Sequence, residues 1–382
     1  MSSGDPVRKG VLRHIPADLR FDCRELAGSL GDFGTILPLT LALAATGAVG
    51  LGPALFFLGV WFIVTGIYYR YPVPVEPMKA IAVIAIATTL SAGEIAAAGL
   101  VLGVIFLLLG FSRVFDLIEK YIPLPVVRGV QLGLAFLLLK TAAGYLVPDP
   151  GFFLVGAIII IAGFFIASHF RIPDLSSIVV IIVAIAAGII LHGLPPLTTL
   201  SLSLFVVPSI PDVLVALKVL VVPQALITIT NAILATSLLA RDLFSAEIRP
   251  KTLSKTIGVM NLVSVPFGGM PMCHGAGGMA GQYRFGARTG GANVYAGSFL
   301  IGAALLFAST AWVGLISPGF YAALLVFVAI ELGRHGLKTT SYTVTIAIAV
   351  LSLVLSMTVA FIAGMCLAYG IPVVKKHMRL EK

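Results

Sequence analysis

Apolar runs of about twenty residues follow one another along nearly the whole chain, separated by short polar or basic groups. A helix needs about 20 apolar residues to cross the hydrocarbon core of a bilayer. The pattern therefore predicts an all-α polytopic membrane protein with fourteen transmembrane segments. In the first half we expect segments at 26–46, 53–69, 72–89, 94–111, 125–145, 152–168 and 175–192. In the second half we expect them at 213–240, 252–267, 270–290, 292–312, 318–332, 339–355 and 357–374.

Proline and glycine interrupt the apolar pattern in the third and tenth segments. The run Tyr71–Ala80 contains three prolines ahead of a helix expected from about Met78, and Gly268 to Pro271 precede a helix expected from about His274. The first N–H groups of each new helix have no intrahelical partner, which favours an anion there. Interrupted helices in corresponding positions of two halves indicate a transporter's binding site. The alternative is that both stretches are Gly/Pro-rich loops between spans.

Seven segments in each half require the two halves to lie in opposite orientations in the membrane. This predicts an inverted repeat, with residues 26–192 as the first copy and 213–374 as the second. A proline-rich connector, residues 193–212, joins the copies, and a basic cytosolic tail, residues 1–25, precedes them.

The positive charges test this scheme. If the N-terminus is cytosolic, all of the 25 lysines and arginines fall on the cytosolic side except Lys79, Lys140 and Lys218. That asymmetry follows the positive-inside rule and predicts that both termini are cytosolic, in a plasma or inner membrane.

Composition removes several other classes of protein. The chain is 59% hydrophobic and only 11% charged, whereas an ordinary globular protein is about 25% charged. The net charge of +9 is explained by the topology, so no nucleic-acid partner is expected. Three scattered cysteines form no disulfide framework, and Cys273 beside His274 is too small a set for a metal site. With no nucleophile–base pair, we expect neither an enzyme nor a cofactor.

Charged residues inside spans are costly and usually functional. Asp32 lies in the first span between Gly31 and Gly34, and Glu76 and Lys79 begin the third. We expect Glu76 and Lys79 to pair across one turn, with Pro77 in the first helical turn. Asp32 is either a site residue or a structural acid at a helix crossing, and Lys79 either faces substrate or serves only Glu76.

Neutral polar residues supply further candidate donors. Gln224, Thr228 and Asn231 lie in the eighth span, the counterpart of the first, and either bind substrate or join helices. His274 lies at the tip of the tenth helix and either donates to an anion or titrates, or only caps the helix. Lys140 is read as a snorkelling side chain.

These motifs resemble the molybdate transporter branch of the sulfate permease superfamily. The resemblance rests on Gly31–Thr35, Pro72–Ala80, Pro223-Gln224 with Asn231, and Cys273–Arg288, and it extends over essentially the whole chain. It implies fourteen segments in two inverted repeats, the fold shared with uracil permease. It also implies a core domain (26–115 and 213–313) that moves against a gate domain (116–192 and 314–374), often in a homodimer.

The residues and the resemblance together predict a secondary active transporter of molybdate. The anion is expected between the N-termini of the third and tenth helices. Sulfate or another oxyanion, or an anion channel or uniporter, remains the alternative. The predicted substrate contacts are Asp32, Thr35, Met78, Lys79, Gln224, Thr228, Asn231, His274, Gly275, Ala276 and Gly277.

A coupled proton is expected on Asp32, with Glu76 as the second candidate. A dianion beside Asp32 and the loss of water around it both favour the protonated carboxyl. Proton uptake would then accompany anion binding, which is a route to symport.

Overall fold

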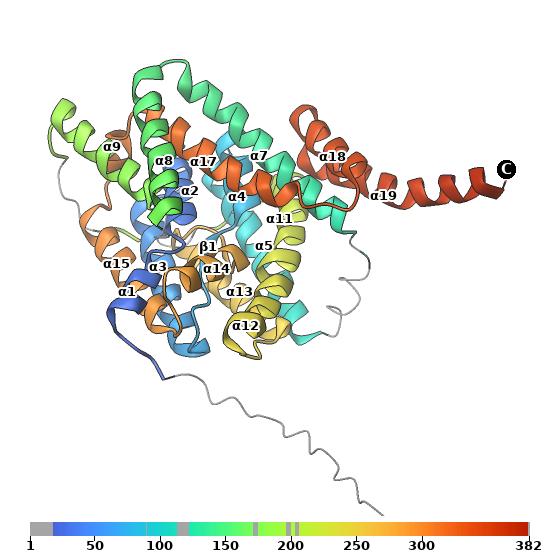
Figure 1. The fold of residues 1–382 in the computed structure, drawn as a ribbon, viewed down its shortest axis with the longest axis horizontal. Helices are drawn as coiled ribbons and strands as arrows, with labels where there is room; N and C mark the ends of the chain where they lie inside the picture. Colours follow the sequence, from blue (N-terminus) through green and yellow to red (C-terminus); the bar gives the residue numbers. More distant parts are fainter. Residues whose placement is uncertain are drawn as a thin grey trace, which may run out of the picture.

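The computed structural model describes residues 18–88, 90–112, 121, 123–170, 175–195, 200–202 and 206–380. Most of the predicted N-terminal tail and part of the predicted connector 193–212 lie outside these residues. Within them the chain is mainly helical (Figure 1).

The first half contains eight described helices and one short strand. They are α1 (Cys23–Ser29), α2 (Phe33–Ala45), α3 (Leu51–Tyr69), β1 (Glu76–Pro77), α4 (Lys79–Thr88), α5 (Ala92–Phe111), α7 (Leu124–Leu146), α8 (Pro150–Phe170) and α9 (Ser176–His192). α1 begins inside the predicted tail because Asp22 caps it, accepting the N–H groups of Arg24 and Glu25.

The second half begins with one long helical run that contains two π-helical stretches. This run comprises α10 (Ile210–Ala216), η1 (Leu217–Val221), α11 (Val222–Ile227), η2 (Thr228–Ala235) and α12 (Thr236–Phe244). It is followed by α13 (Pro250–Ser264), η3 (Val265–Phe267), β2 (Met272–Cys273), α14 (Ala276–Arg284), α15 (Gly291–Leu306), α16 (Thr310–Gly314), α17 (Pro318–Gly336), α18 (Tyr342–Val354) and α19 (Met357–Leu380). π-helical turns are uncommon and frequently mark functional positions in helices.

Length and apolar composition identify the helices that are able to cross a membrane. Six described segments qualify, at 23–45, 51–69, 92–111, 124–146, 150–170 and 210–244, and five shorter apolar helices accompany them. The chain is therefore an integral, multi-pass membrane protein, as the hydropathy pattern predicted. The exact number of fourteen spans stays a prediction.

Two segments that were expected to be continuous are divided. The expected helix 26–46 is split between α1, which ends at Ser29, and α2, which begins at Phe33. The expected helix 292–312 ends at Leu306, and a separate short helix, α16, begins at Thr310. Ser309 causes the restart because its side chain accepts the N–H of Ala311 and caps α16.

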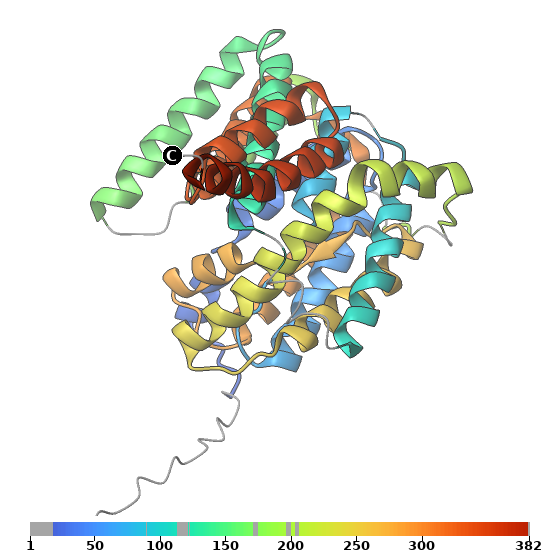
Figure 2. The ribbon, with the colours of Figure 1, turned by 90° about the vertical axis from the view of Figure 1, so that its right-hand side faces the viewer.

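The helices form two groups that lie side by side. α7, α8, α17 and α18 gather in the upper part of Figures 1 and 2, whereas α1, α3, α13, α14 and α15 occupy the lower part. α7 packs on α17 and α18 in the upper group, and α3 packs on α15 in the lower group.

Glycine allows the closest of these helix crossings. Where α3 meets α15, a Cβ added to Gly59 would collide with the carbonyl of Gly297, and one added to Gly297 would collide with the carbonyl of Gly59. Small residues at such crossings let the backbones of membrane helices approach closely. The lower group is therefore closely packed, and the two interrupted segments are attached to it.

Candidate functional site

The two short strands meet at the centre of the molecule and place two helix N-termini near each other. β1 and β2 pair antiparallel, with Glu76 opposite Cys273 and Pro77 opposite Met272. α4 begins two residues after β1, and α14 begins three residues after β2. The prolines of both segments exclude helix and leave extended backbone. Extended backbone therefore precedes both helices, and the two broken transmembrane segments stay a prediction.

Two details of these starts differ from the sequence interpretation. Pro77 lies in β1 rather than in the first helical turn, because α4 begins only at Lys79. His274 lies ahead of α14, whose N-cap is Gly275. The strand pairing keeps the backbone extended for one to two residues more than the sequence pattern indicated.

Two buried asparagines, which the sequence interpretation did not select, hold the extended segments. The Asn261 side chain accepts the N–H of Met272 at 2.9 Å and donates to the Met272 carbonyl at 2.6 Å. Asn293 donates to the carbonyl of Val73 at 2.5 Å and to the hydroxyl of Thr65 at 3.1 Å. Both asparagines are fully buried. An asparagine within an apolar span is the signal that would have identified them, because its amide needs partners there.

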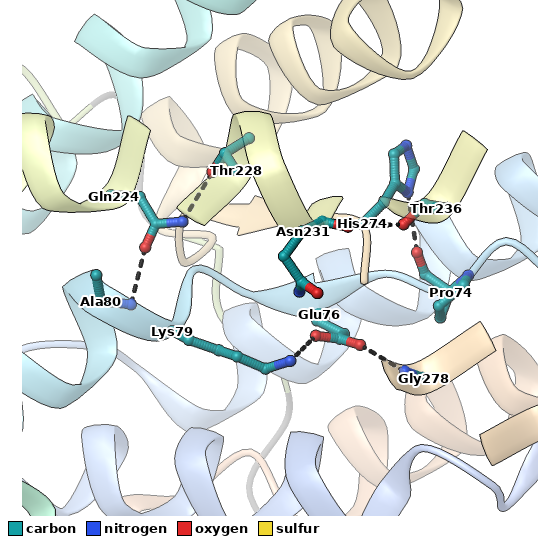
Figure 3. Close-up of polar contacts among 10 residues, drawn as sticks. All are labelled: Pro74, Glu76, Lys79, Ala80, Gln224, Thr228, Asn231, Thr236, His274 and Gly278. Carbon is teal, nitrogen blue, oxygen red and sulfur yellow. Dashed lines mark hydrogen bonds and ion pairs between the residues drawn. The ribbon is translucent and has the colours of Figure 1, made fainter. Parts of the chain in front are cut away.

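The N-terminus of α4 is capped by a neutral side chain from the long second-half helical run. Gln224 Oε1 accepts the N–H groups of Ala80 at 2.9 Å and Ile81 at 3.3 Å, and Gln224 Nε2 donates to Thr228 Oγ1 at 2.8 Å (Figure 3). The N–H of Met78 donates to the Pro271 carbonyl at 2.9 Å. Three amide groups at this helix tip therefore already have protein acceptors.

The N-terminus of α14 is met by a carboxylate instead. Glu76 Oε1 accepts the N–H of Gly278 at 3.1 Å, and Glu76 Oε2 lies 2.5 Å from Lys79 Nζ (Figure 3). The predicted Glu76–Lys79 pair is therefore present. The N–H groups of Ala276 and Gly277 belong to the first turn of α14, where a helix supplies no acceptor.

Asp32, at the start of α2, also lies near the N-terminus of α14. A Cβ added to Gly278 would collide with both the Asp32 and the Glu76 carboxylates. Asp32 is 4% exposed, and its Oδ2 has no hydrogen-bond partner among the described residues. α2 and α14 come this close because Gly31 and Gly281 meet backbone to backbone.

A cavity of about 850 Å³ reaches this cluster. Its polar lining includes Asp32, Lys79, Gln131 and Asn231, and the Asn231 side chain points towards the side on which Glu76 and Lys79 lie (Figure 3). Exposed Arg284 and Arg334 also line it, and Phe164, Phe165 and Phe327 supply apolar wall. A cavity with a few convergent polar groups is the usual form of a small-ligand site.

The structure divides the predicted site residues into two sets. The cavity is lined by Asp32, Thr35, Lys79, Asn231 and Gly277. The predicted residues outside its lining are Met78, Gln224, Thr228, His274, Gly275 and Ala276. Glu76 does not line the cavity either, but it pairs with Lys79, which does. The sequence interpretation did not select Gln131, Gly278, Gly281 or Arg334, all of which line the cavity.

His274 in particular is held by the protein itself. Its ring is fully buried, with Nδ1 2.9 Å from the Pro74 carbonyl and Nε2 2.8 Å from Thr256 Oγ1. The histidine therefore joins the lead-ins of α4 and α14 to α13. Of the two interpretations of His274, the geometry favours the structural one.

The chain matches a family of known transporters. A family model described as "Molybdate transporter of MFS superfamily" matches residues 24–138 and 216–332, more than half of the chain. Molybdate transporter 2 of Arabidopsis thaliana is 32% identical over 86% of this chain and 82% of its own length. Molybdate transporter 1 of the same plant is 30% identical, over 85% of this chain and 82% of its own length.

The chain belongs to the molybdate transporter family. It is accordingly a membrane transporter and not an enzyme, as the sequence predicted.

Two solved anion transporters share the fold. The transmembrane domain of the cyanobacterial bicarbonate transporter BicA is 18% identical with a TM-score of 0.66, covering 89% of this chain and 96% of that domain. The murine anion transporter solute carrier 26 family member A9, in an inward-facing state, is 13% identical with a TM-score of 0.71, covering 94% of this chain and 69% of its own. The likeness shows that this chain has the fold of these two anion transporters.

Proposed function

We propose that this protein is a secondary active transporter of molybdate and that its substrate binds at the inner end of the cavity. The observation that carries the proposal is the cluster there: the Lys79 ammonium, the Asn231 amide and the first turn of α14 all border the cavity. A tetrahedral oxyanion offers many acceptor oxygens, which suits one cation and several neutral donors. The curated relatives, named as molybdate transporters, support molybdate as the oxyanion.

The anion lies closer to α14 than to α4 in this proposal. Gln224 already accepts the N–H groups of Ala80 and Ile81, so α4 contributes mainly the Lys79 side chain. α14 contributes the Gly277 amide, and Thr35 of α2 is a further hydroxyl at the cavity wall. The predicted position between two helix tips is kept, with unequal contributions from the two.

The packing of the helices supports the proposed inverted repeat of seven segments each. In a repeat of seven segments, α3 corresponds to α13, and α15 corresponds to α5. The packing of α3 on α15 therefore has its counterpart in the packing of α13 on α5. In the same way, the packing of α7 on α18 has its counterpart in the packing of α17 on α8. The packing of α2 on α9 has its counterpart in the packing of α11 on α19. The pairing of β1 with β2 lies at the centre of this relation.

The charge distribution gives the proposed orientation. Arg284 and Arg334 line the cavity and belong to the side that the positive-inside rule places in the cytosol. The cavity therefore opens to the cytosol, with both termini on that side. Arg249 and Lys338 are expected there too, and Lys218 on the outside.

Transport requires the cavity to open alternately to the two sides. The upper group in Figures 1 and 2 falls within the proposed gate domain (116–192 and 314–374), and the lower group, apart from the first residues of α1, falls within the proposed core domain (26–115 and 213–313). The cavity lies between them, since α2, α4 and α14 line it from one side and α7, α8 and α17 from the other. Rocking of one group against the other moves the site between the two sides.

Proton coupling through Asp32 is the final part of the proposal. Asp32 and Glu76 face one lysine, so the cluster has one acid more than it has bases. A dianion is repelled by this excess unless one acid is protonated. Binding of the anion with a proton on Asp32 removes the repulsion.

Uptake of labelled molybdate into proteoliposomes tests the function. We expect saturable uptake that unlabelled molybdate and tungstate inhibit. An inward proton gradient should raise the internal molybdate concentration above the external one. Stronger inhibition by sulfate than by molybdate would make the protein a sulfate transporter. A steady anion current without saturable exchange would make it a channel.

A further inference from the structure

The Glu76 carboxylate already occupies the kind of position that an oxyanion would take. One of its oxygens accepts the Gly278 N–H at the start of α14, and the other pairs with Lys79 (Figure 3). The side chain is 1% exposed, so it makes these contacts away from water. A helix N-terminus and a lysine are both common partners of phosphate-like groups in proteins.

A second observation indicates that this position is not a settled structural bridge. Asp32 Oδ2 is buried beside Gly278, next to the Glu76 carboxylate, and has no hydrogen-bond partner among the described residues. A buried carboxylate oxygen without a partner is costly. The cluster therefore contains two acids for one available cation, so the two carboxylates compete for Lys79.

Among the described residues, the surroundings of Glu76 offer no second cation. From β2, Cys273 lies opposite it, and the adjacent His274 ring is engaged by Pro74 and Thr256. From α4 it faces Lys79, from α14 the Gly278 amide, and from α2 Asp32. Lys79 is thus the one basic side chain within ion-pair distance of Glu76 in the described part of the chain, and an incoming anion must share it.

We propose that Glu76 is an internal competitor of the substrate: its carboxylate occupies Lys79 and the α14 amide in the empty transporter and yields both to the bound oxyanion. The inference rests on the proposed function, because it assigns Glu76 a role at the same anion site. It differs from coupling through Asp32, since the competitor acts on affinity even without a proton gradient. Its effect is to keep the buried lysine paired while the site is empty and to weaken binding enough for release.

The competing interpretation makes Glu76 a positioning residue. In that case the carboxylate only holds Lys79 and α14 in place, and the anion binds with all of these contacts intact. The two interpretations predict opposite signs for the loss of the Glu76 charge. Removing a competitor tightens binding, whereas removing a positioning group weakens it.

The primary test is Glu76→Gln, measured by calorimetric titration of the purified, detergent-solubilised protein with molybdate. The amide keeps the shape of the side chain and its acceptor for Gly278 but releases Lys79, which retains Asp32 as a nearby acid. We expect binding about tenfold tighter than in the wild type, because a charge-assisted contact no longer has to be given up. Unchanged or weaker binding would overturn the proposal.

Glu25→Gln is the matched control. Glu25 is also a buried carboxylate that accepts two backbone N–H groups, those of Arg288 and Thr289, but it does not line the cavity. Its variant is expected to bind molybdate as the wild type does. A similar gain of affinity in this variant would remove the special role of Glu76.

Glu76→Asp keeps the proposal testable if Glu76→Gln does not fold. The shorter side chain retains the charge but withdraws it from the Gly278 amide, so a competitor loses strength and molybdate binds more tightly. A positioning residue gives weaker binding in the same variant. If the wild-type protein binds neither molybdate nor sulfate, the proposed function itself fails, which is distinct from wild-type binding without a gain in the Glu76 variants.

Discussion

The N-termini of α4 and α14 have corresponding places in the proposed inverted repeat but different chemistry. Counted from the first helical residue, Ala80 and Ile81 of α4 correspond to Gly277 and Gly278 of α14. In α4 both N–H groups are accepted by one neutral amide, Gln224. In α14 one is accepted by a carboxylate and the other borders the cavity.

The helices differ in composition in the same direction. α4 reads KAIAVIAIAT and is almost wholly apolar and buried beyond its lysine, whereas α14 reads AGGMAGQYR and has glycine at its second and third positions. Glycine lets a ligand or another chain approach the backbone closely. The difference indicates that α4 is fixed as a structural element and that α14 provides the ligand-facing tip.

Gly278→Ala is expected to have the largest effect on this arrangement. The new methyl group would collide with the Asp32 and Glu76 carboxylates, and both must move because the site is buried. Overpacking of this kind costs about 1–3 kcal/mol, which corresponds to roughly five- to 140-fold weaker binding if it falls on the site. We expect molybdate uptake in proteoliposomes to be lost. Wild-type uptake would show that the two carboxylates are free to move away.

Asp32→Asn is expected to remove one activity and preserve another. If Asp32 carries the coupled proton, the variant still exchanges internal for external molybdate but no longer accumulates it against a gradient. Both are measured in the same proteoliposomes, as counterflow without a pH gradient and as uptake with one. Gradient-driven uptake at the wild-type level would exclude Asp32 as the coupling group and make Glu76 the next candidate.

Gln224→Leu tests the α4 side of the comparison. The substitution leaves the N–H groups of Ala80 and Ile81 without an acceptor, at a cost of about 1–3 kcal/mol for a buried unsatisfied group. We expect a lower temperature of thermal unfolding and molybdate affinity within about threefold of the wild type, since the cavity does not reach Gln224.

Thr228→Val is the control for this variant. It removes only the hydroxyl that accepts from Gln224 Nε2 and leaves the cap on α4 intact. Its loss of stability should be smaller. A large loss of affinity in Gln224→Leu with unchanged stability would instead place Gln224 in direct contact with the anion, as one reading of the sequence has it.

The sequence was sufficient to predict that extended backbone precedes two of the helices, because proline and glycine act locally. It also predicted the Glu76–Lys79 pair, although Glu76 lies in β1 and Lys79 begins α4, so the pair spans the strand–helix junction and not a helical turn. It was not sufficient to decide what Gln224 and His274 contact. Their partners are 144 and 200 residues away along the chain, and a residue type alone does not distinguish a ligand donor from a cap.

The cavity lining shows the same limit. Gly31 and Gly281 were read as parts of motifs, but their meeting backbone to backbone depends on how α2 crosses α14. The contribution of Gln131 and Arg334 from α7 and α17 depends on how the two groups of helices face each other. Such contacts follow from tertiary packing, which hydropathy and local motifs do not encode individually.

Gly277→Ala should have the smallest effect and provides the sharpest contrast with Gly278→Ala. A Cβ added to Gly277 meets no atom within 4 Å, and the residue lines the cavity, so the methyl group enters open space. Alanine is also a better helix former than glycine by about 1 kcal/mol. We expect equal or slightly higher thermal stability and molybdate affinity within about twofold of the wild type.

The series Gly277→Ala, Gly277→Val and Gly277→Leu should then lose affinity stepwise without losing stability, as the side chain fills the space next to the α14 amides. Calorimetric titration and thermal unfolding on the same samples separate the two quantities. If Gly277→Leu bound molybdate as the wild type does, the anion would not lie against the tip of α14, and the contrast between the two helices would be structural only.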